Sequence, residues 1–443
     1  MQVEQMQEKD AYKTSRVLYI VEAALEYFIS LLVSGAFLAN VTSSIGISDS
    51  LTGILTSFVS LGCGFQLIAI FLANKRPVKR WVTLLHSCNQ AFFAFVYLVP
   101  FVPLSKTAKV VIFIVFLLLG HAINNVVNAP KINWYMNLVD DKKRGRFTAN
   151  KEMVSLIGGM IFSFIIGSVS DYFKEVGNLN GAFIFSGVGI FVLMISHTLV
   201  LLFSKEKPIE NEREVKVSTG KMLSELVKDK NLFKVIFVTV LWNIANYVSL
   251  PFYGTYQIKE LGFTMTFVSL LSALYAICRT LFSSPMGKFA DKYSFAKMLS
   301  VCFVIKAFAF LINIFTVPAN GKIFYTTYYM LTAVAMAGIN SATINLIYDY
   351  VDKEKRMCAL ALNGTCGGFA GFFTTLAVSP LVSFIQNNGN QIFGVQVYAQ
   401  QVVSAISFVL VLGVIFYLNF VVAKLKNKRA VSVNDAKTQV ERD

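Results

Sequence analysis

The stretch Ile132–Ala149, INWYMNLVDDKKRGRFTA, recurs 212 positions later as Ile344–Ala361, INLIYDYVDKEKRMCALA. Seven of the eighteen aligned positions are identical, and each copy lies where a long apolar run meets a basic loop. The identical pairs are Ile132/Ile344, Asn133/Asn345, Val139/Val351, Asp140/Asp352, Lys143/Lys355, Arg144/Arg356 and Ala149/Ala361. Because an internal repeat marks a repeated architecture, an offset close to half of the chain predicts two similar halves.

The composition indicates a membrane protein. Apolar residues make up 55% of the chain and charged residues only 15%, far less charge than a soluble protein of this length carries. The apolar residues form twelve runs that are long enough to cross a hydrocarbon core about 30 Å thick. These runs are 17–40, 51–73, 81–104, 109–130, 152–170, 181–203, 232–254, 263–285, 295–317, 323–348, 358–384 and 398–423. The predicted fold class is therefore all-α integral membrane, with twelve transmembrane helices in two pseudo-symmetric six-helix halves.

The runs divide the chain into four expected parts. These are an N-terminal six-helix half at 1–203, a cytoplasmic linker at 204–231, a C-terminal six-helix half at 232–426 and a disordered cytoplasmic tail at 427–443. Within the linker, residues 218–230 carry apolar side chains on one face of a helix, namely Met222, Leu223, Leu226 and Val227. This pattern predicts a short amphipathic helix lying on the membrane surface. A plain tether is the open alternative.

Basic residues are sorted to one side of the predicted membrane. Thirty-three of the forty Lys and Arg residues lie in the termini, the linker and the even-numbered loops, whereas five lie in the odd-numbered loops and two, Arg279 and Lys306, lie inside spans. The positive-inside rule then predicts a plasma or inner membrane protein with both termini in the cytoplasm. This sorting explains the net charge of +15 without nucleic acid, so we expect the lipid bilayer as a partner and no nucleic acid.

The sequence shows no pattern typical of an enzyme or of a cofactor site. The six cysteines have no pairing or CxxC pattern, and the three histidines lie in different spans without metal-ligand spacing. The Gly-Lys pairs at 220, 287 and 321 are followed by Met, Phe and Ile, so none forms a Walker loop. We therefore expect no catalytic residues, no metal and no cofactor, and coupling to an ion gradient, either proton or sodium.

Two six-span halves, a long cytoplasmic link and both termini inside resemble the major facilitator superfamily. The segment GKFADKYSFAK at 287–297, after the eighth span, is similar to the superfamily signature Gly-x-x-x-Asp-Arg/Lys-x-Gly-x-Arg/Lys-Arg/Lys. Gly287, Asp291, Lys292 and Lys297 match the signature, whereas Ser294 and Ala296 depart from it. The resemblance implies that Asp291 helps to hold the cytoplasmic helix ends together in one state. An ordinary basic loop with one acid is the alternative interpretation.

The two repeat copies carry a further candidate switch. Asp140 and Arg144, like Asp352 and Arg356, are spaced i, i+4 with the acid first, which favours an ion pair along a helix. An exposed pair of this kind contributes only a few tenths of a kcal/mol. The resemblance offers the alternative that these groups cross between the halves and close the cytoplasmic side. Together with Gly287, Asp291 and Lys292 they are the predicted conformational-switch residues.

Two carboxylates inside the first span are the predicted proton-coupling residues. Glu22, Glu26, Ser30 and Ser34 follow at steps of four, which places them on one helix face. Burying two carboxylates in hydrocarbon costs several kcal/mol, so at least one must be protonated or paired. Glu26 lies nearer the span centre and is the first candidate, with Glu22 about 6 Å closer to the cytoplasm. A structural ion pair with Lys306 or Arg279 is the alternative.

In the superfamily that the chain resembles, spans one, four, seven and ten line the central cavity. Polar residues at mid-depth usually face a cavity, and the last three of these spans each carry a set of them. The predicted substrate-binding residues are His121, Asn124, Asn125, Asn128, Trp242, Asn243, Asn246, Tyr247, Tyr329 and Asn340. Amides beside aromatic faces are suited to a sugar or polyol. Polar contacts between helices are the alternative explanation.

These features predict a secondary transporter that works by alternating access as a monomer. The first hypothesis is proton-coupled uptake of a small neutral polar solute such as a sugar or glycoside. The absence of proline between 131 and 207 favours uptake, since exporters of the superfamily typically carry a Gly-Pro signature in span five. Acids in span one also occur in drug/proton exporters, so a drug/proton antiporter is the second hypothesis. A transporter-like sensor that moves nothing is the third.

Overall fold

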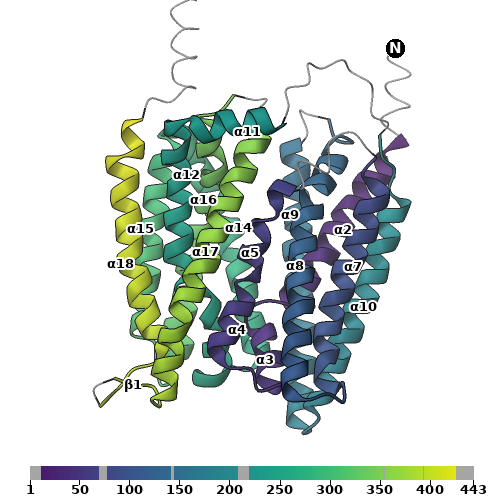
Figure 1. Ribbon diagram of the computed structural model, residues 1–443, viewed down its shortest axis with the longest axis vertical. Helices are drawn as coiled ribbons and strands as arrows, with labels where there is room; N and C mark the ends of the chain where they lie inside the picture. The colour runs from purple at the N-terminus through teal and green to yellow at the C-terminus, as the bar shows by residue number, and fades with distance from the viewer. Residues whose placement is uncertain are drawn as a thin grey trace, which may run out of the picture. The chain divides into compact units, whose positions relative to one another are not determined.

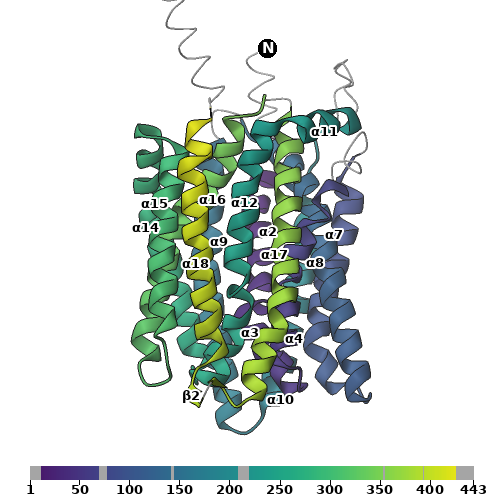
Figure 2. The ribbon, with the colours of Figure 1, turned by 60° about the vertical axis from the view of Figure 1, so that its left-hand side comes forward.

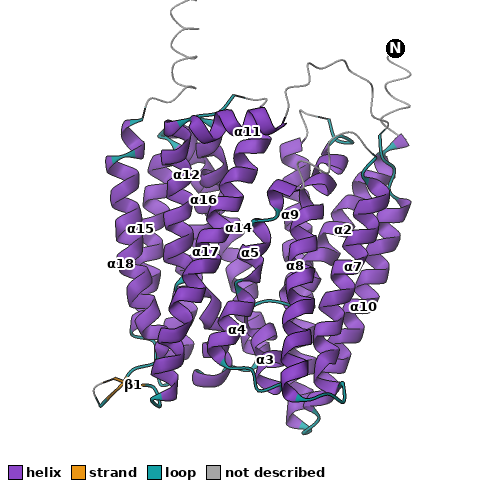
Figure 3. Cartoon of the chain, viewed as in Figure 1, coloured by secondary structure: helices purple, strands orange, loops and turns teal. Residues whose placement is uncertain are grey.

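The computed structural model describes residues 11–68, 77–140, 144–207, 219–352, 355–392 and 394–425. Nearly all of these residues are helical (Figure 3). A short antiparallel strand pair, β1 (Gln391–Ile392) and β2 (Val395–Gln396), lies between the last two long helices. The tail expected at 427–443 and the linker residues 208–218 lie outside the described residues.

The helices follow the predicted apolar runs. The first half contains α2 (Lys13–Leu32), α3 (Gly35–Ser44), α4 (Asp49–Thr56), α5 (Phe58–Cys63), α7 (Lys79–Leu98), α8 (Lys106–Met136), α9 (Arg144–Glu175) and α10 (Leu179–Phe203). After α11 (Thr219–Lys228), the second half contains α12 (Lys230–Tyr247), α13 (Tyr253–Thr255), α14 (Met265–Lys292), α15 (Phe295–Ile314), α16 (Gly321–Tyr348), α17 (Arg356–Asn387) and α18 (Ala399–Phe420). A π-helical turn, Tyr256–Glu260, follows α13.

The predicted number of membrane spans is confirmed. Among the described residues, eleven helical segments are long and apolar enough to cross a membrane, and α2 with α3 makes a twelfth span that is bent by 45°. A run of about twenty apolar residues can satisfy its backbone in hydrocarbon only as a helix, which is why hydropathy alone located these elements. The chain is therefore a multi-pass membrane protein of the predicted all-α class.

The two halves repeat the same helix packing. In the first half α7 packs against α8 and α10, and α2 packs against α9 and α10 (Figure 1). In the second half α15 packs against α16 and α18, and α12 packs against α17 and α18 (Figure 2). When the spans are numbered one to six within each half, both halves pair the third span with the fourth and sixth, and the first span with the fifth and sixth. The internal repeat in the sequence thus corresponds to a repeated arrangement of helices.

The compact units of the structure differ from the sequence halves in one segment. One unit comprises Met1–Glu214 and Pro251–Ala276, and the other comprises Val215–Leu250 and Ile277–Asp443. The hairpin between α12 and α14, which the sequence assigns to the second half, therefore packs with helices of the first half. The four-part division into 1–203, 204–231, 232–426 and 427–443 stays a prediction.

The bend in the first span allows the hairpin between α12 and α14 to pack closely against α3. Ser34 is extended, and Gly35 adopts the left-handed backbone conformation (φ 53°), which only glycine accepts without strain. A Cβ atom on Gly254, in α13, would lie 2.5 Å from the Gly35 carbonyl oxygen. Because backbone blocks this position, the contact between α3 and α13 requires glycine at 254.

One helix extends further than its apolar run. The predicted fourth span ends at Pro130, because proline lacks an N–H group and usually ends a helix. The structure instead continues α8 through Pro130 to Met136, since membrane helices tolerate proline where neighbouring helices pack against it. Lys131, which the charge count placed in a cytoplasmic loop, is consequently only 1% exposed.

We expect the substitution Gly254→Ala to lower stability by about 1–3 kcal/mol, the usual cost of overpacking. The new methyl group would meet backbone atoms of Gly35 and Ala36, which cannot rotate away. Thermal unfolding of the purified protein in detergent should therefore show a lower Tm. Gly189→Ala, where a Cβ would meet nothing within 4 Å, is the matched control and should keep or slightly raise the Tm. Equal midpoints for the two variants would contradict this role of Gly254.

Candidate functional site

A cavity of about 440 Å³ lies within the first unit, among helices α2, α7, α8 and α9. Its wall combines ionisable, amide and aromatic side chains. The lining includes Tyr19, Glu22, Glu26, Tyr27 and Ser30 of α2, His86, Asn89, Gln90 and Phe93 of α7, Asn124, Asn128 and Lys131 of α8, and Lys151, Glu152 and Ser155 of α9. A cavity of this size matches a small polar solute.

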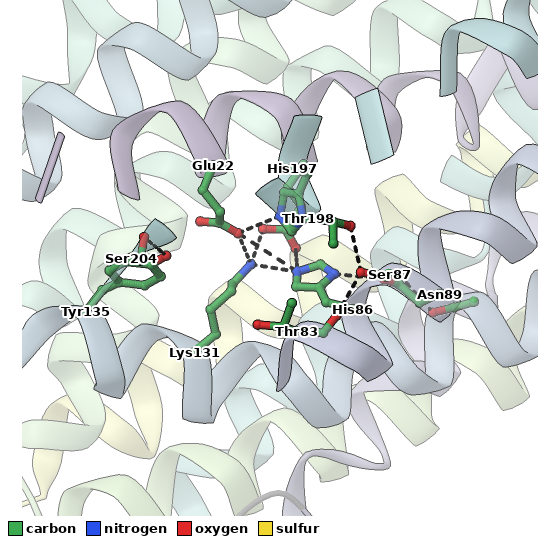
Figure 4. A network of polar contacts seen from close by, with 12 residues as sticks. Glu22, Thr83, His86, Ser87, Asn89, Lys131, Tyr135, His197, Thr198 and Ser204 are labelled. Atoms are coloured by element: carbon green, nitrogen blue, oxygen red, sulfur yellow. Dashed lines mark hydrogen bonds and ion pairs between the residues drawn. The ribbon is translucent and has the colours of Figure 1, made fainter. Parts of the chain in front are cut away.

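Lys131 is the centre of the polar network in this cavity. Its ammonium group bonds to Glu22 Oε1 at 2.7 Å, to Glu26 Oε2 and to His86 Nε2 at 2.9 Å. Figure 4 shows the Lys131 side chain reaching from α8 between Glu22 and His86. Glu22 and Glu26 reach the same ammonium because residues four apart lie on one helix face. Pairing with Lys306 or Arg279, which the sequence left open as an alternative, is wrong, because both acids pair with Lys131.

Two histidines complete the network. His86 on α7 places its Nδ1 atom 2.8 Å from Asn89 Oδ1. His197 on α10 places its Nε2 atom 2.9 Å from Glu22 Oε1, and its ring centroid lies 4.5 Å from that of His86. Both rings and Glu22 are fully buried, whereas the Glu26 side chain is 23% exposed toward the cavity. No local sequence pattern joins these two histidines, because 111 positions separate them along the chain.

The network has an uneven charge. Two carboxylates face one ammonium, and a buried ion that lacks a counter-charge costs several kcal/mol in a membrane interior. With neutral histidines, the group carries one net negative charge. One bound proton would therefore remove the imbalance.

Several polar atoms in the cavity wall have no hydrogen-bond partner among the residues that the structure describes. Both amide atoms of Gln90, the Oδ1 atom of Asn124 and the hydroxyl of Ser155 are buried and unpaired. An unpaired buried polar group costs about 1–3 kcal/mol, so native proteins rarely leave such groups without a ligand or water. These three side chains come from α7, α8 and α9 and border one space, which makes them available to a bound solute.

The structure separates the predicted binding residues of the fourth span into two groups. Asn124 and Asn128 line the cavity. His121 is buried against Phe93, with ring centroids 4.9 Å apart, and is outside the lining. Asn125 donates a hydrogen bond to the His121 carbonyl oxygen at 3.0 Å and accepts one from Gln66 at 3.4 Å. The polar stripe expected on one face thus serves both a cavity and helix packing.

The predicted binding residues of the second half lie in the other unit. Trp242 packs on Phe303, with ring centroids 5.1 Å apart, and Asn243 donates to the Thr239 carbonyl oxygen at 2.8 Å. The Tyr247 carbonyl oxygen accepts from Thr375 at 2.9 Å, and the Tyr329 ring lies 5.5 Å from that of Tyr325. Asn246 is half-buried and Asn340 is exposed. A shared substrate site for these side chains stays a prediction.

Lys306, whose role the sequence left open, is almost completely buried in the second unit. Its ammonium donates to Thr332 Oγ1 at 3.0 Å and lies 4.4 Å from the centre of the Phe310 ring. Among the described residues, no carboxylate lies within ion-pair distance of it. Hydroxyl and aromatic groups therefore stabilise this ammonium in place of a counter-ion.

The predicted switch residues lie at helix ends. Gly287, Asp291 and Lys292 occupy the last turns of α14, and Lys292 lies 5.3 Å from the Tyr293 ring. Asp140 is exposed after α8, and the Arg144 side chain lies outside what the structure describes. The Arg356 guanidinium lies 4.6 Å from the centre of the Tyr348 ring. The switching role of these residues stays a prediction.

An exposed ion pair links α11 to the start of α17. Lys355 Nζ donates to Glu225 Oε2 at 2.6 Å. This hydrogen bond lowers the pKa of Glu225 and raises the pKa of Lys355. Because both groups are exposed, water screens the pair and its contribution to stability is small. The contribution is present at neutral pH and is lost as the pH falls through the lowered pKa of Glu225.

Three side chains of the network lie close enough together to bind a metal ion. Ligand-type atoms of Glu22, His86 and His197 lie within 4.8 Å of one another. The Lys131 ammonium, however, bonds to two of these side chains and supplies the positive charge that a metal ion would bring. We interpret the group as an ion-pair network and assign no metal to it.

Comparison with known proteins places the chain in a transporter family. The family model described as Major Facilitator Superfamily matches residues 23–375 and 235–440. No curated protein matches the sequence. Among solved structures, the nucleoside transporter NupG is similar at 13% identity with a TM-score of 0.66, covering 93% of this chain and 99% of that chain.

Two further structures share the fold. A D-xylose–proton symporter is similar at 13% identity with a TM-score of 0.65, covering 91% of this chain and 97% of that one. The E. coli fucose:proton symporter FucP is similar at 13% identity with a TM-score of 0.53, covering 91% and 98%. At such low identity the similarity establishes the fold alone.

We expect Lys131→Met to destabilise the protein by about 3–5 kcal/mol, because it leaves two carboxylates without their cation. Thermal unfolding in detergent should show a clearly lower Tm at neutral pH. Replacing all three ionisable groups in a Glu22→Gln, Glu26→Gln, Lys131→Met variant should restore most of the loss. Lys174→Met, at the exposed end of α9, is the control. A Lys131→Met protein as stable as this control would contradict the central place of Lys131.

Proposed function

Because this chain belongs to the major facilitator superfamily and is a transporter, we propose that it takes up a small neutral polar solute together with protons. The observation that supports this most directly is the cavity of the first unit. It combines unpaired amide and hydroxyl groups with a buried acid–base network that lacks one positive charge. The amide and hydroxyl groups can recognise a solute, and the acid–base network can take up a proton.

The cavity chemistry favours a neutral hydroxylated solute. Gln90, Asn124 and Ser155 offer donors and acceptors, and Phe93 and Tyr27 offer aromatic faces. The buried charges are engaged with one another through Lys131, so an organic cation would find no uncommitted carboxylate in the network. The similar transporters are named for nucleosides, D-xylose and fucose, which are all neutral polyhydroxylated compounds.

The network supports proton coupling. Transport of a proton requires a group that gains and loses it while the membrane interior disfavours net charge. Glu22 and Glu26 share one ammonium, so binding of one proton neutralises the site. A substrate hydroxyl that bonds to Glu26 on its cavity side would compete with Lys131 for that carboxylate. Proton and solute binding are thereby linked through Lys131.

Alternating access requires contacts that can break. Asp171, on α9, accepts hydrogen bonds from the backbone N–H groups of Met265 at 2.9 Å and Thr266 at 2.7 Å. Lys259 pairs with Asp49, and Ser269 Oγ donates to the Ser163 carbonyl oxygen at 2.7 Å. These contacts tie the α12–α14 hairpin to first-half helices. We propose that they open when the transporter changes state.

The charge distribution supports the remaining parts of the proposal. Lys and Arg concentrate in the termini, the linker and the even-numbered loops, which supports cytoplasmic termini in a plasma or inner membrane. The transporting unit is proposed to be a monomer, because the cavity and its ionisable network are built within one chain.

Purified protein in proteoliposomes should accumulate at least one of three labelled probes, D-xylose, L-fucose or uridine, when the pH outside is lowered. With one proton per solute, a gradient of one pH unit drives at most about tenfold accumulation, since each 1.4 kcal/mol is tenfold. A protonophore should abolish accumulation but leave exchange of internal and external solute intact. Glu175→Gln, an exposed carboxylate at the end of α9, should behave as the wild type.

Accumulation that follows a sodium gradient and ignores the protonophore would contradict proton coupling. Proton-driven movement of tetraphenylphosphonium in the opposite direction, without uptake of the three probes, would favour the drug/proton antiporter instead. Failure of all three probes to bind, measured as an unchanged Tm, would contradict the neutral-solute proposal.

A further inference from the structure

We propose that the transported proton resides on the Glu22–His197 pair, and that His86 is a fixed neutral acceptor. This inference deepens the proposed proton coupling and rests on it. It changes the order expected from the sequence, where Glu26 was the first candidate.

The Lys131 ammonium determines the state of His86. An ammonium has three N–H bonds, and Lys131 has three acceptors, in Glu22, Glu26 and His86. His86 Nε2 must therefore accept a hydrogen bond, which requires an unprotonated nitrogen. The proton of a neutral His86 then lies on Nδ1.

Asn89 holds His86 in that tautomer. The Asn89 amide nitrogen donates to the Gly120 carbonyl oxygen at 3.5 Å, which turns the amide oxygen toward His86. The oxygen accepts from His86 Nδ1 at 2.8 Å. Both ring nitrogens of His86 are thus committed, and a further proton on Nε2 would meet the Lys131 ammonium at 2.9 Å. His86 is therefore unsuited to carry the proton.

Unlike His86, both His197 and Glu22 have an atom that can accept another proton. His197 Nε2 donates to Glu22 Oε1 at 2.9 Å, while His197 Nδ1 and Glu22 Oε2 are buried and have no hydrogen-bond partner in the described part of the chain. A proton can be added at either atom without breaking a bond that the structure contains. The two groups are hydrogen-bonded, so the proton belongs to the pair rather than to one residue.

The surrounding charges favour this position. The groups that face the pair are Tyr19 and Glu26 from α2, His86 from α7, Lys131 and Tyr135 from α8, and Lys151 and Glu152, which line the adjoining cavity from α9. Lys131 opposes a positive charge on His197, whereas Glu22 and Glu26 favour it. With one proton on the pair, the Glu22, Glu26, Lys131 and histidine charges sum to zero, which removes the cost of an unbalanced buried ion.

Glu26 differs because its side chain reaches the cavity, where water or a solute hydroxyl can solvate the carboxylate. It keeps a negative charge at lower cost than the fully buried Glu22. We assign Glu26 to solute binding and to holding Lys131. Protonation of the pair weakens the hold of Glu22 on Lys131, which links the buried proton to the ammonium that Glu26 shares with the cavity.

The first test observes the histidines directly. The chain has only three, so ¹⁵N-histidine labelling of the full-length protein in nanodiscs gives three sets of ring signals. Single His86→Gln and His197→Gln variants assign them. The His86 signals should be those of the neutral Nδ1–H tautomer, because Nε2 accepts from Lys131 and Nδ1 donates to Asn89. The His197 signals should change with pH, and Glu22→Gln should alter that change. His86 signals of the Nε2–H tautomer, or His197 signals that do not change with pH, would overturn the inference.

The second test uses transport of whichever probe the proteoliposomes accumulate. Glu22→Gln should lose proton-driven accumulation and retain exchange, because a neutral amide mimics a permanently protonated pair. Glu26→Gln should keep proton-driven accumulation with a KM raised about tenfold or more, the effect of one lost charged hydrogen bond. His197→Gln, which keeps an N–H donor for Glu22, should remove the pH dependence of exchange. Proton-driven accumulation that survives in Glu22→Gln but not in Glu26→Gln would overturn the assignment.

The two tests separate this inference from the proposed function. Titration of His197 in a protein that moves none of the probes with protons would refute the function and leave the proton site. Proton-driven uptake together with an invariant His197 would support the function and refute the site.

Discussion

The first half of the molecule depends on one ammonium group inside the membrane. Lys131 joins two acidic residues of α2 to a histidine of α7, and all four side chains lie where an unpaired charge is costly. The ion pair constrains which helices can be neighbours, because moving α8 away would strand two carboxylates. In the proposed mechanism, a single proton or a competing hydroxyl changes the partners of Lys131.

The duplication explains why the two halves share a helix arrangement, but it does not explain their different buried polar groups. Both halves pack their helices in the same four pairs, yet the buried lysine of each half has different partners. In the first half Lys131 has carboxylate partners, whereas in the second half Lys306 lies among Phe310, Tyr328 and Thr332. A carboxylate pair can exchange a proton, while an aromatic and hydroxyl shell mainly stabilises the ammonium. The proposed proton chemistry therefore belongs to the first half.

Two glycines allow helices that are far apart in the sequence to pack closely. Gly35 permits the bend of the first span, and Gly254 allows α13 to approach it at backbone distance. Asp171 then binds the free N–H groups at the start of α14, which carry a partial positive charge. These contacts are polar, and they join segments that lie far apart in the sequence within one compact unit.

The sequence alone determined the membrane class, the twelve spans and the repeat, because each depends on local properties: a run of apolar residues must be helical in hydrocarbon, and a duplicated segment is visible by comparison. It also located Glu22, Glu26, Asn124 and Asn128, since polar residues stand out in apolar runs. Only the tertiary structure showed that Lys131 is buried beyond Pro130 and that His86 and His197 meet Glu22. Those contacts join positions that are 45 to 175 residues apart, and helix packing, which no local pattern records, brings them together.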